Sequence, residues 1–301
     1  MAFAGAGGYQ NLPSGNFSPQ IYSQKVLKFF RTASVVEDIT NTDYSGEIEN
    51  FGDTVKIIKE PTVTVRAYTR GTTVNVEDLA DNQLTLTVDQ GSYFAFKVDD
   101  IEERHSHVNW ESLATSSGAY ALKESFDENI IAYMVANVAS GNTIGSDGSG
   151  QDVGFGSGEV DPANLLANHA RRLHVNDVPE ENRWFLASPQ FYEQLGQSVS
   201  KLMAVEITGD DASQLRNGRM TDRIVHGFRL YSTNNFAASS TSNYYKVLSG
   251  HMSAVATANH IAKTEVVRDP DSFADIVRGL HVYGRKLLRS KALFLEHILV
   301  D

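Results

Sequence analysis

The chain contains no cysteine among its 301 residues. This absence excludes disulfide bonds, thiolate metal sites and cysteine nucleophiles, so stability must come from packing, hydrogen bonds or association with other chains. The sequence also lacks an apolar run of the roughly 18–20 residues that a membrane-spanning helix needs. Residues 1–8 lack the basic and apolar regions of a secretory signal. We therefore expect a soluble protein that is not exported by the usual route.

Motifs of common enzymes and nucleotide-binding proteins are also missing. The sequence has no Gly-Lys pair to complete a phosphate-binding loop and no G-x-S-x-G nucleophile elbow. Gly154, Gly156 and Gly158 lack the G-x-G-x-x-G spacing of a dinucleotide site, and they follow a predicted helix instead of a strand. We interpret this stretch as a loop. We expect no enzymatic activity and no bound cofactor.

One pair of histidines has the residue types of a metal site. His105 and His107 are separated by one residue, so both side chains would face the same way on a strand. Four acidic residues closely precede them: Asp99, Asp100, Glu102 and Glu103. The pair lies at a predicted junction of a strand and a helix, where a solvated helix entry explains it without a metal. A metal-dependent hydrolase that uses these histidines is the alternative from a different functional class.

Positive charge is scarce overall and is concentrated near the two ends. The formal net charge is −11, which argues against a general nucleic-acid binder because such proteins need a basic surface. Residues 1–36 carry bases but no acid, and five bases lie between Asp275 and Glu296 with no acid among them. Residues 37–111 hold 16 acids against 6 bases. Such a chain can be self-complementary between copies, although chance asymmetry on a solvated surface explains the pattern equally well.

The N-terminal third changes from a glycine-rich pattern to a helical one and then to a strand pattern. Residues 1–18 predict a flexible arm, and residues 19–31 predict a short amphipathic helix. From residue 53 to residue 98 the apolar period becomes two, which predicts a long antiparallel hairpin with a polar tip at 68–83. Four segments carry the alternation: 55–57, 63–67, 84–88 and 94–98. Such a ribbon is only marginally stable alone in water.

A long helix is predicted next, over residues 106–139. Apolar residues recur on one face at helical spacing. They are Ala119, Leu122, Phe126, Ile130 and Tyr133. A second, weaker stripe consists of Leu113, Tyr120, Ile131 and Val138. Two apolar faces predict that the helix is packed on two sides, as a spine.

The remainder alternates between helices and strands. The glycine- and serine-rich loop 140–158 marks a boundary. Asp161-Pro162 predicts a helix start, Trp184–Ala187 a strand and Ser188-Pro189 another helix. Together they indicate an α+β subdomain from 161 to about 265. Three closing strands are predicted after it: Leu280–Tyr283, Lys286–Leu288 and Ala292–Val300.

Three stretches, together with the order of the elements, resemble a known family. They are Gly46–Ile57, Leu84–Asp100 and Val178–Tyr192, the last with its Val178-Pro179, Arg183-Trp184-Phe185-Leu186 and Ser188-Pro189 motifs. The chain resembles the major capsid proteins of tailed double-stranded DNA bacteriophages, whose fold is shared with herpesvirus shells and encapsulins. The resemblance covers nearly the whole chain, and its motifs are structural.

The resemblance implies an α+β fold in four parts. It assigns residues 1–36 to an N-terminal arm and helix, 53–98 to an extended β-hairpin loop, 99–160 with 266–301 to a peripheral domain, and 161–265 to an axial domain. The peripheral domain would include the long spine helix 106–139. The hairpin loop would lie over a neighbouring subunit, and the axial domain would meet its copies at the five- or six-fold centres.

The resemblance also implies a structural function. The chain would self-assemble as hexamers and pentamers into an icosahedral phage head that encloses double-stranded DNA without sequence-specific binding. Its other partners would be a portal and scaffolding or decoration proteins, with no membrane contact. It would be a virion component made in the bacterial host cytoplasm. An encapsulin-like nanocompartment shell, which holds cargo protein, and a phage tail protein are the alternatives among assembling proteins.

The charge asymmetry suggests one specific contact between copies. We predict that the acidic tip of the hairpin contacts the basic closing segment of a neighbour. The acidic tip consists of Glu77, Asp78 and Asp81, and the basic segment consists of Arg285, Lys286, Arg289 and Lys291. Some capsids of this family carry a lysine–asparagine crosslink, but this tip contains no lysine, so no crosslink is predicted here.

Overall fold

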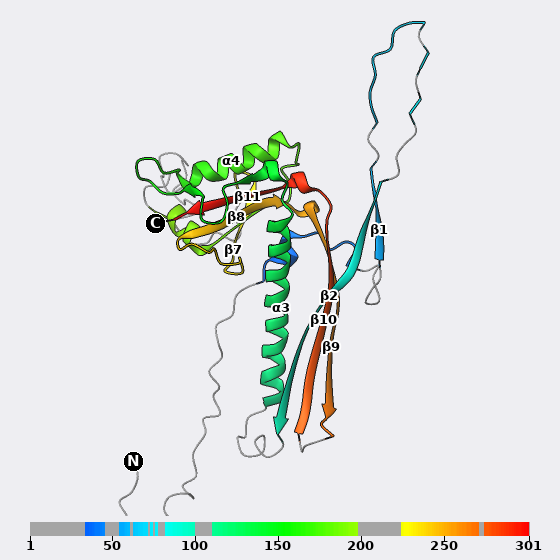
Figure 1. Cartoon of the computed structure of the whole chain (residues 1–301), viewed down its shortest axis with the longest axis vertical. Helices are drawn as coiled ribbons and strands as arrows, with labels where there is room; N and C mark the ends of the chain where they lie inside the picture. The colour runs from blue at the N-terminus through cyan, green and yellow to red at the C-terminus, as the bar shows by residue number, and fades with distance from the viewer. Residues whose placement is uncertain are drawn as a thin grey trace, which may run out of the picture.

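The structure, a computed structural model, describes residues 34–45, 54–60, 63–71, 73–74, 76–77, 82–99, 110–197, 224–270 and 274–300. Figure 1 shows a broad lobe, a long lobe and an extended hairpin. The broad lobe contains a seven-stranded sheet with helix α4 (Pro162–Val175) and helix α5 (Pro189–Leu195). The long lobe contains helix α3 (Trp110–Ala136) beside a four-stranded sheet. The hairpin extends from β1 (Thr54–Lys59) and β2 (Asn82–Asp99).

The remaining elements complete these lobes. In the long lobe they are β9 (Val255–Arg268) and β10 (Ala274–Leu287), with the short helix α1 (Val36–Ile39) against α3. In the broad lobe they are β3 (Thr143–Ile144), β4 (Gln151–Asp152), β5 (Arg183–Ala187), β6 (Ile224–Val225), β7 (Phe228–Ser232), β8 (Tyr244–His251) and β11 (Leu293–Leu299). Three 3-10 turns are η2 (Ser140–Asn142), η3 (Met252–Ala254) and η4 (Ser290–Ala292).

Strand β2 has two different partners along its length. In the antiparallel sheet of order β1-β2-β10-β9, residues 82–87 of β2 pair with β1. From Val88 to Asp99 the same strand pairs with β10. One continuous strand of 18 residues therefore belongs both to the hairpin and to the body of the long lobe.

Helix α3 packs on two sides, as its two apolar stripes predict. On the sheet side, the Phe126 ring meets the Tyr283 ring edge-on at 4.9 Å between centroids. Leu122 and Ile130 are buried on the same helix. On the side of α1, Asp127 of the helix accepts the Val35 N–H at 3.1 Å, and Ile131 of the second stripe is also buried. The helix thus joins the sheet to the N-terminal end of the described chain.

The helix is shorter than the predicted range 106–139. It ends at Ala136, where the side-chain amide of Asn137 donates a hydrogen bond to the Tyr133 carbonyl at 2.8 Å. Asn favours helix ends because its side chain competes for backbone groups. The predicted start at 106–109 lies outside the described residues. Ala119, which the pattern placed on the buried face, is exposed.

The predicted strand at 63–67 is wrong, since residues 63–71 form no strand. Val63 and Val65 alternate as in a strand, but both are largely exposed. A strand needs a ladder partner, and the described part of the chain provides none here. The predicted segments 84–88 and 94–98 are parts of the single strand β2.

The closing strands also differ from their predicted limits. Leu280–Tyr283 and Lys286–Leu288 were predicted as two strands, but β10 runs unbroken through Leu287. Shifts of register after His281 and after Tyr283 interrupt the period of two, which explains the apparent break. The predicted boundary at 265 falls inside β9, and β11 pairs with β8 in the broad lobe instead of joining the long lobe.

The broad lobe confirms three predicted elements. The Asp161 carboxylate accepts the Ala163 N–H at 2.8 Å and Pro162 opens α4, as expected of an N-cap and first-turn proline. Strand β5 covers the predicted Trp184–Ala187, and α5 begins at Pro189. Every residue of β5 is buried, in a sheet of order β3-β11-β8-β5-β7-β6.

A polar trio lies inside the core of the broad lobe. His169 of α4 is 0% exposed, and its Nδ1 lies 2.8 Å from the Ser249 hydroxyl. Its Nε2 lies 2.9 Å from the Glu296 carboxylate. The ring packs edge-on against Phe294, with 4.5 Å between centroids. Burial lowers the pKa of His169, while Glu296 acts in the opposite direction and Arg172 adds to the lowering.

Phe94 of β2 is clamped between two glycines. A Cβ atom at Gly279, its partner on β10, would lie 2.3 Å from the ring. A Cβ atom at Gly118 of α3 would lie 2.8 Å from the same ring. Both distances are shorter than van der Waals contact. A side chain at either glycine would therefore overlap the space that the Phe94 ring occupies.

We predict that Gly279→Ala destabilises the long lobe. A methyl group at Gly279 would overlap the Phe94 ring, which also lies close to Gly118, and overpacking of this kind costs about 1–3 kcal/mol. The free energy of unfolding, measured in urea, should fall by that amount. Gly141→Ala is the matched control, because a Cβ at Gly141 meets nothing within 4 Å. Equal stability of both variants would contradict the clamp.

We also predict that the buried imidazole of His169 makes the protein less stable in mild acid. Its pKa is lowered in the folded state, so below about pH 6.5 the unfolded chain binds a proton that the folded chain does not. The free energy of unfolding then falls as pH falls, by up to about 1.4 kcal/mol per pH unit for one proton. His169→Gln should make this fall shallower between pH 7.5 and 5.5.

The control for this measurement is His226→Asn. His226 is exposed and has a positive φ of 49°, a conformation that Asn tolerates well. This substitution should leave the pH dependence of unfolding unchanged. If the free energy of unfolding falls equally steeply with pH in His169→Gln and in the parent chain, His169 is not the source of the pH dependence.

Candidate intersubunit surface

The hairpin exposes large apolar side chains. Val65 is 95% exposed and Val76 is 85% exposed. Four more are at least 68% exposed: Ile58, Val63, Tyr68 and Val74. Extended apolar patches on soluble proteins mark interaction sites. The hairpin is therefore the strongest candidate for contact with another chain.

The acidic tip is partly neutralised within its own hairpin. Glu77 forms an ion pair with Arg66 and accepts the Thr64 N–H at 3.3 Å. These contacts join the two sides of the hairpin where no strand ladder forms. Of the predicted tip residues, Asp78 and Asp81 lie outside the described part of the chain.

The first half of the basic segment contacts its own chain. Arg285 donates a hydrogen bond to the Asn129 carbonyl at 2.6 Å, and its guanidinium lies 4.8 Å from the centre of the Tyr133 ring. The hydroxyl of Tyr133 accepts the Leu287 N–H at 3.2 Å. Lys286 is half-buried in the same strand. Arg285 therefore joins β10 to α3, which the sequence pattern did not reveal.

The second half of the basic segment borders a cleft. Arg289 and Lys291 are exposed, and both line a cleft of about 380 Å³ formed by the residues after α4 and by the connection from β10 to β11. Val178 and Pro179 form part of the opposite wall. Arg289 also donates a long hydrogen bond of 3.3 Å to the Ser253 hydroxyl. The lining thus combines apolar groups with two cations and one acid, Asp177, and its net positive charge suits a segment that is both apolar and acidic.

Among the described residues, the structure does not bring Glu77 to the basic segment of the same chain. In Figure 1 the hairpin projects away from the body of the molecule. The described contacts of Glu77 are with its own hairpin. A contact between Glu77 and this segment therefore requires two copies.

Two other kinds of site have no support in the described residues. No group of three or more His, Cys, Asp or Glu side chains there is arranged to hold a metal ion, and His105 and His107 lie outside them. The trio of Ser249, His169 and Glu296 has the residue types of a hydrolase, but its serine and histidine are 0% exposed. No substrate can reach such a serine. No helix in the described ranges is long and apolar enough to cross a membrane.

Comparison by sequence and comparison by structure give different results. No protein-family model matches the sequence, and no curated protein matches it. Solved structures match over nearly the whole length. A chain of Mycobacterium phage Che8 has 27% sequence identity and a TM-score of 0.74, covering 93% of this chain and 97% of that chain.

Two further matches are described as capsids. The capsid structure of the Cyanophage P-SCSP1u has 16% identity and a TM-score of 0.69, with 95% of this chain and 93% of that chain covered. The asymmetric unit of the bacteriophage PhiM1 mature capsid has 18% identity and a TM-score of 0.66, with 93% and 91% covered. The chain therefore has the fold of phage capsid proteins, and the resemblance to the major capsid proteins of tailed phages is confirmed.

Proposed function

We propose that this chain is the major capsid protein of a tailed phage, a structural protein of the virion. It builds the head as hexamers and pentamers that close into an icosahedral shell around double-stranded DNA. Its full-length likeness to two capsid structures supports this function. The observation that carries self-assembly is the hairpin, whose described apolar side chains are exposed on an extended segment.

The energetic reason for assembly lies in that exposure. Fully burying one valine is worth about 1.5–3 kcal/mol, and a two-stranded hairpin is marginal alone in water. A neighbouring copy that covers the hairpin supplies this burial. Because each copy both offers a hairpin and receives one, such contacts are heterologous and close into rings when the rotation permits.

Charge complementarity supports a specific register for this contact. In the proposed interface the acidic tip of one copy enters the cleft beside Arg289 and Lys291 of the next. Arg285 already contacts Asn129 and Tyr133 within its own chain, so it contributes less. The exposed apolar residues Val74 and Val76, next to the tip, would meet the apolar wall of the cleft.

The proposed partners beyond identical copies follow from the proposed role. A portal and scaffolding or decoration proteins would contact the shell, and the packaged DNA would touch it without sequence-specific binding. The net charge of −11 supports this weak contact, because a wall with a basic surface would bind phosphates. Nuclease-protected DNA inside purified particles supports a phage head, whereas cargo protein without DNA would identify an encapsulin-like compartment.

We predict that Val63→Ser with Val65→Ser weakens shell assembly. Each buried valine lost from the interface costs about 1.5 kcal/mol, and 1.4 kcal/mol is a factor of ten in association. Closed particles are counted by negative-stain microscopy at increasing protein concentration. The concentration at which they first form should be at least about tenfold higher for the double variant than for the parent chain.

The matched control is Ile224→Ser. Ile224 is 66% exposed, like Val63 at 70%, but lies in β6 at the edge of the broad-lobe sheet and lines neither the hairpin nor the cleft. Its replacement should leave the assembly threshold unchanged. Circular dichroism should show that all variants remain folded. Normal particles from the double variant would refute the role of the hairpin.

We also predict that Glu77→Lys with Asp78→Lys reduces assembly and that Arg289→Glu with Lys291→Glu restores it in the same chain. Exposed pairs contribute only about 0–1 kcal/mol each, so the reduction should be smaller than for the valine variant and should shrink at high salt. Particle yield measured by sedimentation at two salt concentrations tests both points.

A single substitution separates this contact from the bonds within the hairpin. Asp78→Lys leaves the ion pair of Glu77 with Arg66 in place, so its effect reports the contact between copies. If the charge-swapped chain assembles no better than Glu77→Lys with Asp78→Lys, the cleft is not the partner of the tip.

A further inference from the structure

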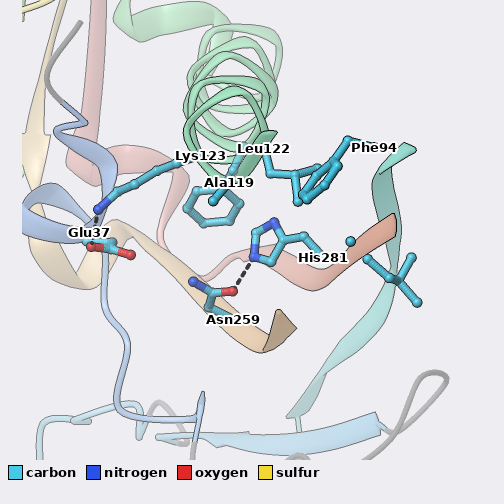
Figure 2. Close-up of a pocket in the computed structure, with 10 residues that line it drawn as sticks. Glu37, Phe94, Ala119, Leu122, Lys123, Asn259 and His281 are labelled. Carbon is cyan, nitrogen blue, oxygen red and sulfur yellow. Dashed lines mark hydrogen bonds and ion pairs between the residues drawn. The ribbon is translucent and has the colours of Figure 1, made fainter. Parts of the chain in front are cut away.

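A second cavity, unrelated to the basic segment, lies in the long lobe between α3 and the sheet. It has a volume of about 170 Å³. Figure 2 shows Phe94, Ala119 and Leu122 on one side of it and His281 with Asn259 on the other. Most of the lining is apolar, and the Lys123–Glu37 ion pair of 3.1 Å bridges α3 and α1 at one side.

The size of the cavity matches one aromatic side chain. An apolar cavity of about 150 Å³ in another protein takes up benzene. The walls supplied by Phe94 and Phe126 add favourable edge-on contacts for a ring. The cavity therefore suits a phenyl group better than a water cluster.

A polar atom without a partner is also buried here. The Nε2 atom of His281 lies within hydrogen-bond distance of the Asn259 side-chain oxygen and, facing an acceptor, carries the proton. The Nδ1 atom is then an acceptor, and it has no hydrogen-bond partner among the described residues. His281 is 8% exposed, and an unsatisfied buried acceptor is costly. An occupant that brings an N–H or O–H beside a ring would satisfy it.

The described chain begins close to this cavity. The Ser34 hydroxyl donates to Asp127 at 2.9 Å, and the Val35 N–H donates to the other carboxylate oxygen at 3.1 Å. Asp127 lies one residue from Phe126 and eight residues from Ala119, about 12 Å along α3 at 1.5 Å per residue. Four extended residues span up to about 14 Å. Phe30, four residues before Ser34, is therefore within reach.

The preceding segment has the composition that the cavity requires. Val26, Phe29 and Phe30 recur at helical spacing, so they share one face of the predicted helix 19–31. The same segment carries Lys25, Lys28 and Arg31 and no acid. The two helices beside the cavity, α1 and α3, have the opposite charge. Their acids in α1 and in residues 116–136 of α3 are Glu37, Asp38, Glu124, Asp127 and Glu128, against the single base Lys123.

We infer that the cavity is the docking site of the N-terminal segment of the same chain, with Phe30 or its neighbour Phe29 inserted between α3 and β10. The basic residues of the segment face the acidic side of α1 and α3. The N–H groups of the segment supply the donor that His281 Nδ1 lacks. This docking ties the arm to the helix of its own subunit before any neighbour is present, so it does not rest on the proposed shell.

Cysteine crosslinking tests this inference cleanly because the chain has no cysteine of its own. The variant Phe30→Cys with Ala119→Cys, as purified full-length protein, should form an intramolecular bond on oxidation or with a short bis-maleimide. The disulfide form should migrate as a faster monomer on a denaturing gel, and reductant should reverse the shift. Phe29→Cys with Ala119→Cys covers the case in which the neighbouring ring is inserted.

The control places the second cysteine on the opposite face of α3. Ala121 is also exposed but is turned by about 200° from Ala119 at 3.6 residues per turn. Phe30→Cys with Ala121→Cys should give at least about tenfold less of the intramolecular product. If the two Ala119→Cys variants form a ladder of crosslinked dimers, the cavity binds the arm of another copy. If neither of these two variants forms a crosslinked product, the arm does not dock in this cavity. Both results overturn the inference, whereas the proposed shell is judged separately by microscopy.

Discussion

The pairing of β2 with two partners is the constraint on which the rest of the molecule depends. Its residues 82–87 bond to β1, and from Val88 onward it bonds to β10. Because the strand is continuous, the direction of the hairpin is set by the sheet of the long lobe. Phe94, held between Gly118 and Gly279, fixes that sheet against α3. The hairpin is therefore presented to its surroundings and does not collapse onto its own chain.

Two backbone hydrogen bonds hold the junction of the two lobes. The Ala254 carbonyl, between β8 and β9, accepts the N–H groups of Leu288 and Arg289 at 2.8 and 3.1 Å. These residues lie between β10 and β11, so both connections between the sheets cross at one point. The same crossing carries Arg289 and Lys291 and borders the cleft of about 380 Å³. A partner that binds in this cleft would contact the end of α4 and the connection from β10 to β11 at once.

Local patterns predicted local structure well. The cap at Asp161-Pro162, strand β5 and the two apolar faces of α3 depend on neighbours a few residues away, and they were predicted correctly. The strand at 63–67 was wrong because alternation specifies a face for burial but does not supply a partner. The limits of β10 were missed because its register shifts break the period, and the sheet membership of β11 is set by residues far away in sequence. The cavity beside Phe94 likewise arises from five elements, α1, β2, α3, β9 and β10, which no single stretch of sequence contains.

Apolar and charged residues contribute free energies of different size to the proposed interface. A buried valine is worth about 1.5–3 kcal/mol, whereas an exposed ion pair is worth about 0–1 kcal/mol. At the proposed interface, affinity between copies would therefore come mainly from residues such as Val65 and Val76, and the acidic tip would select where they bind. The net charge of −11 on every copy opposes indiscriminate association through those same valines. A shell whose individual contacts are weak can correct misplaced subunits before it closes, because only the correct register satisfies the apolar and the charged groups together.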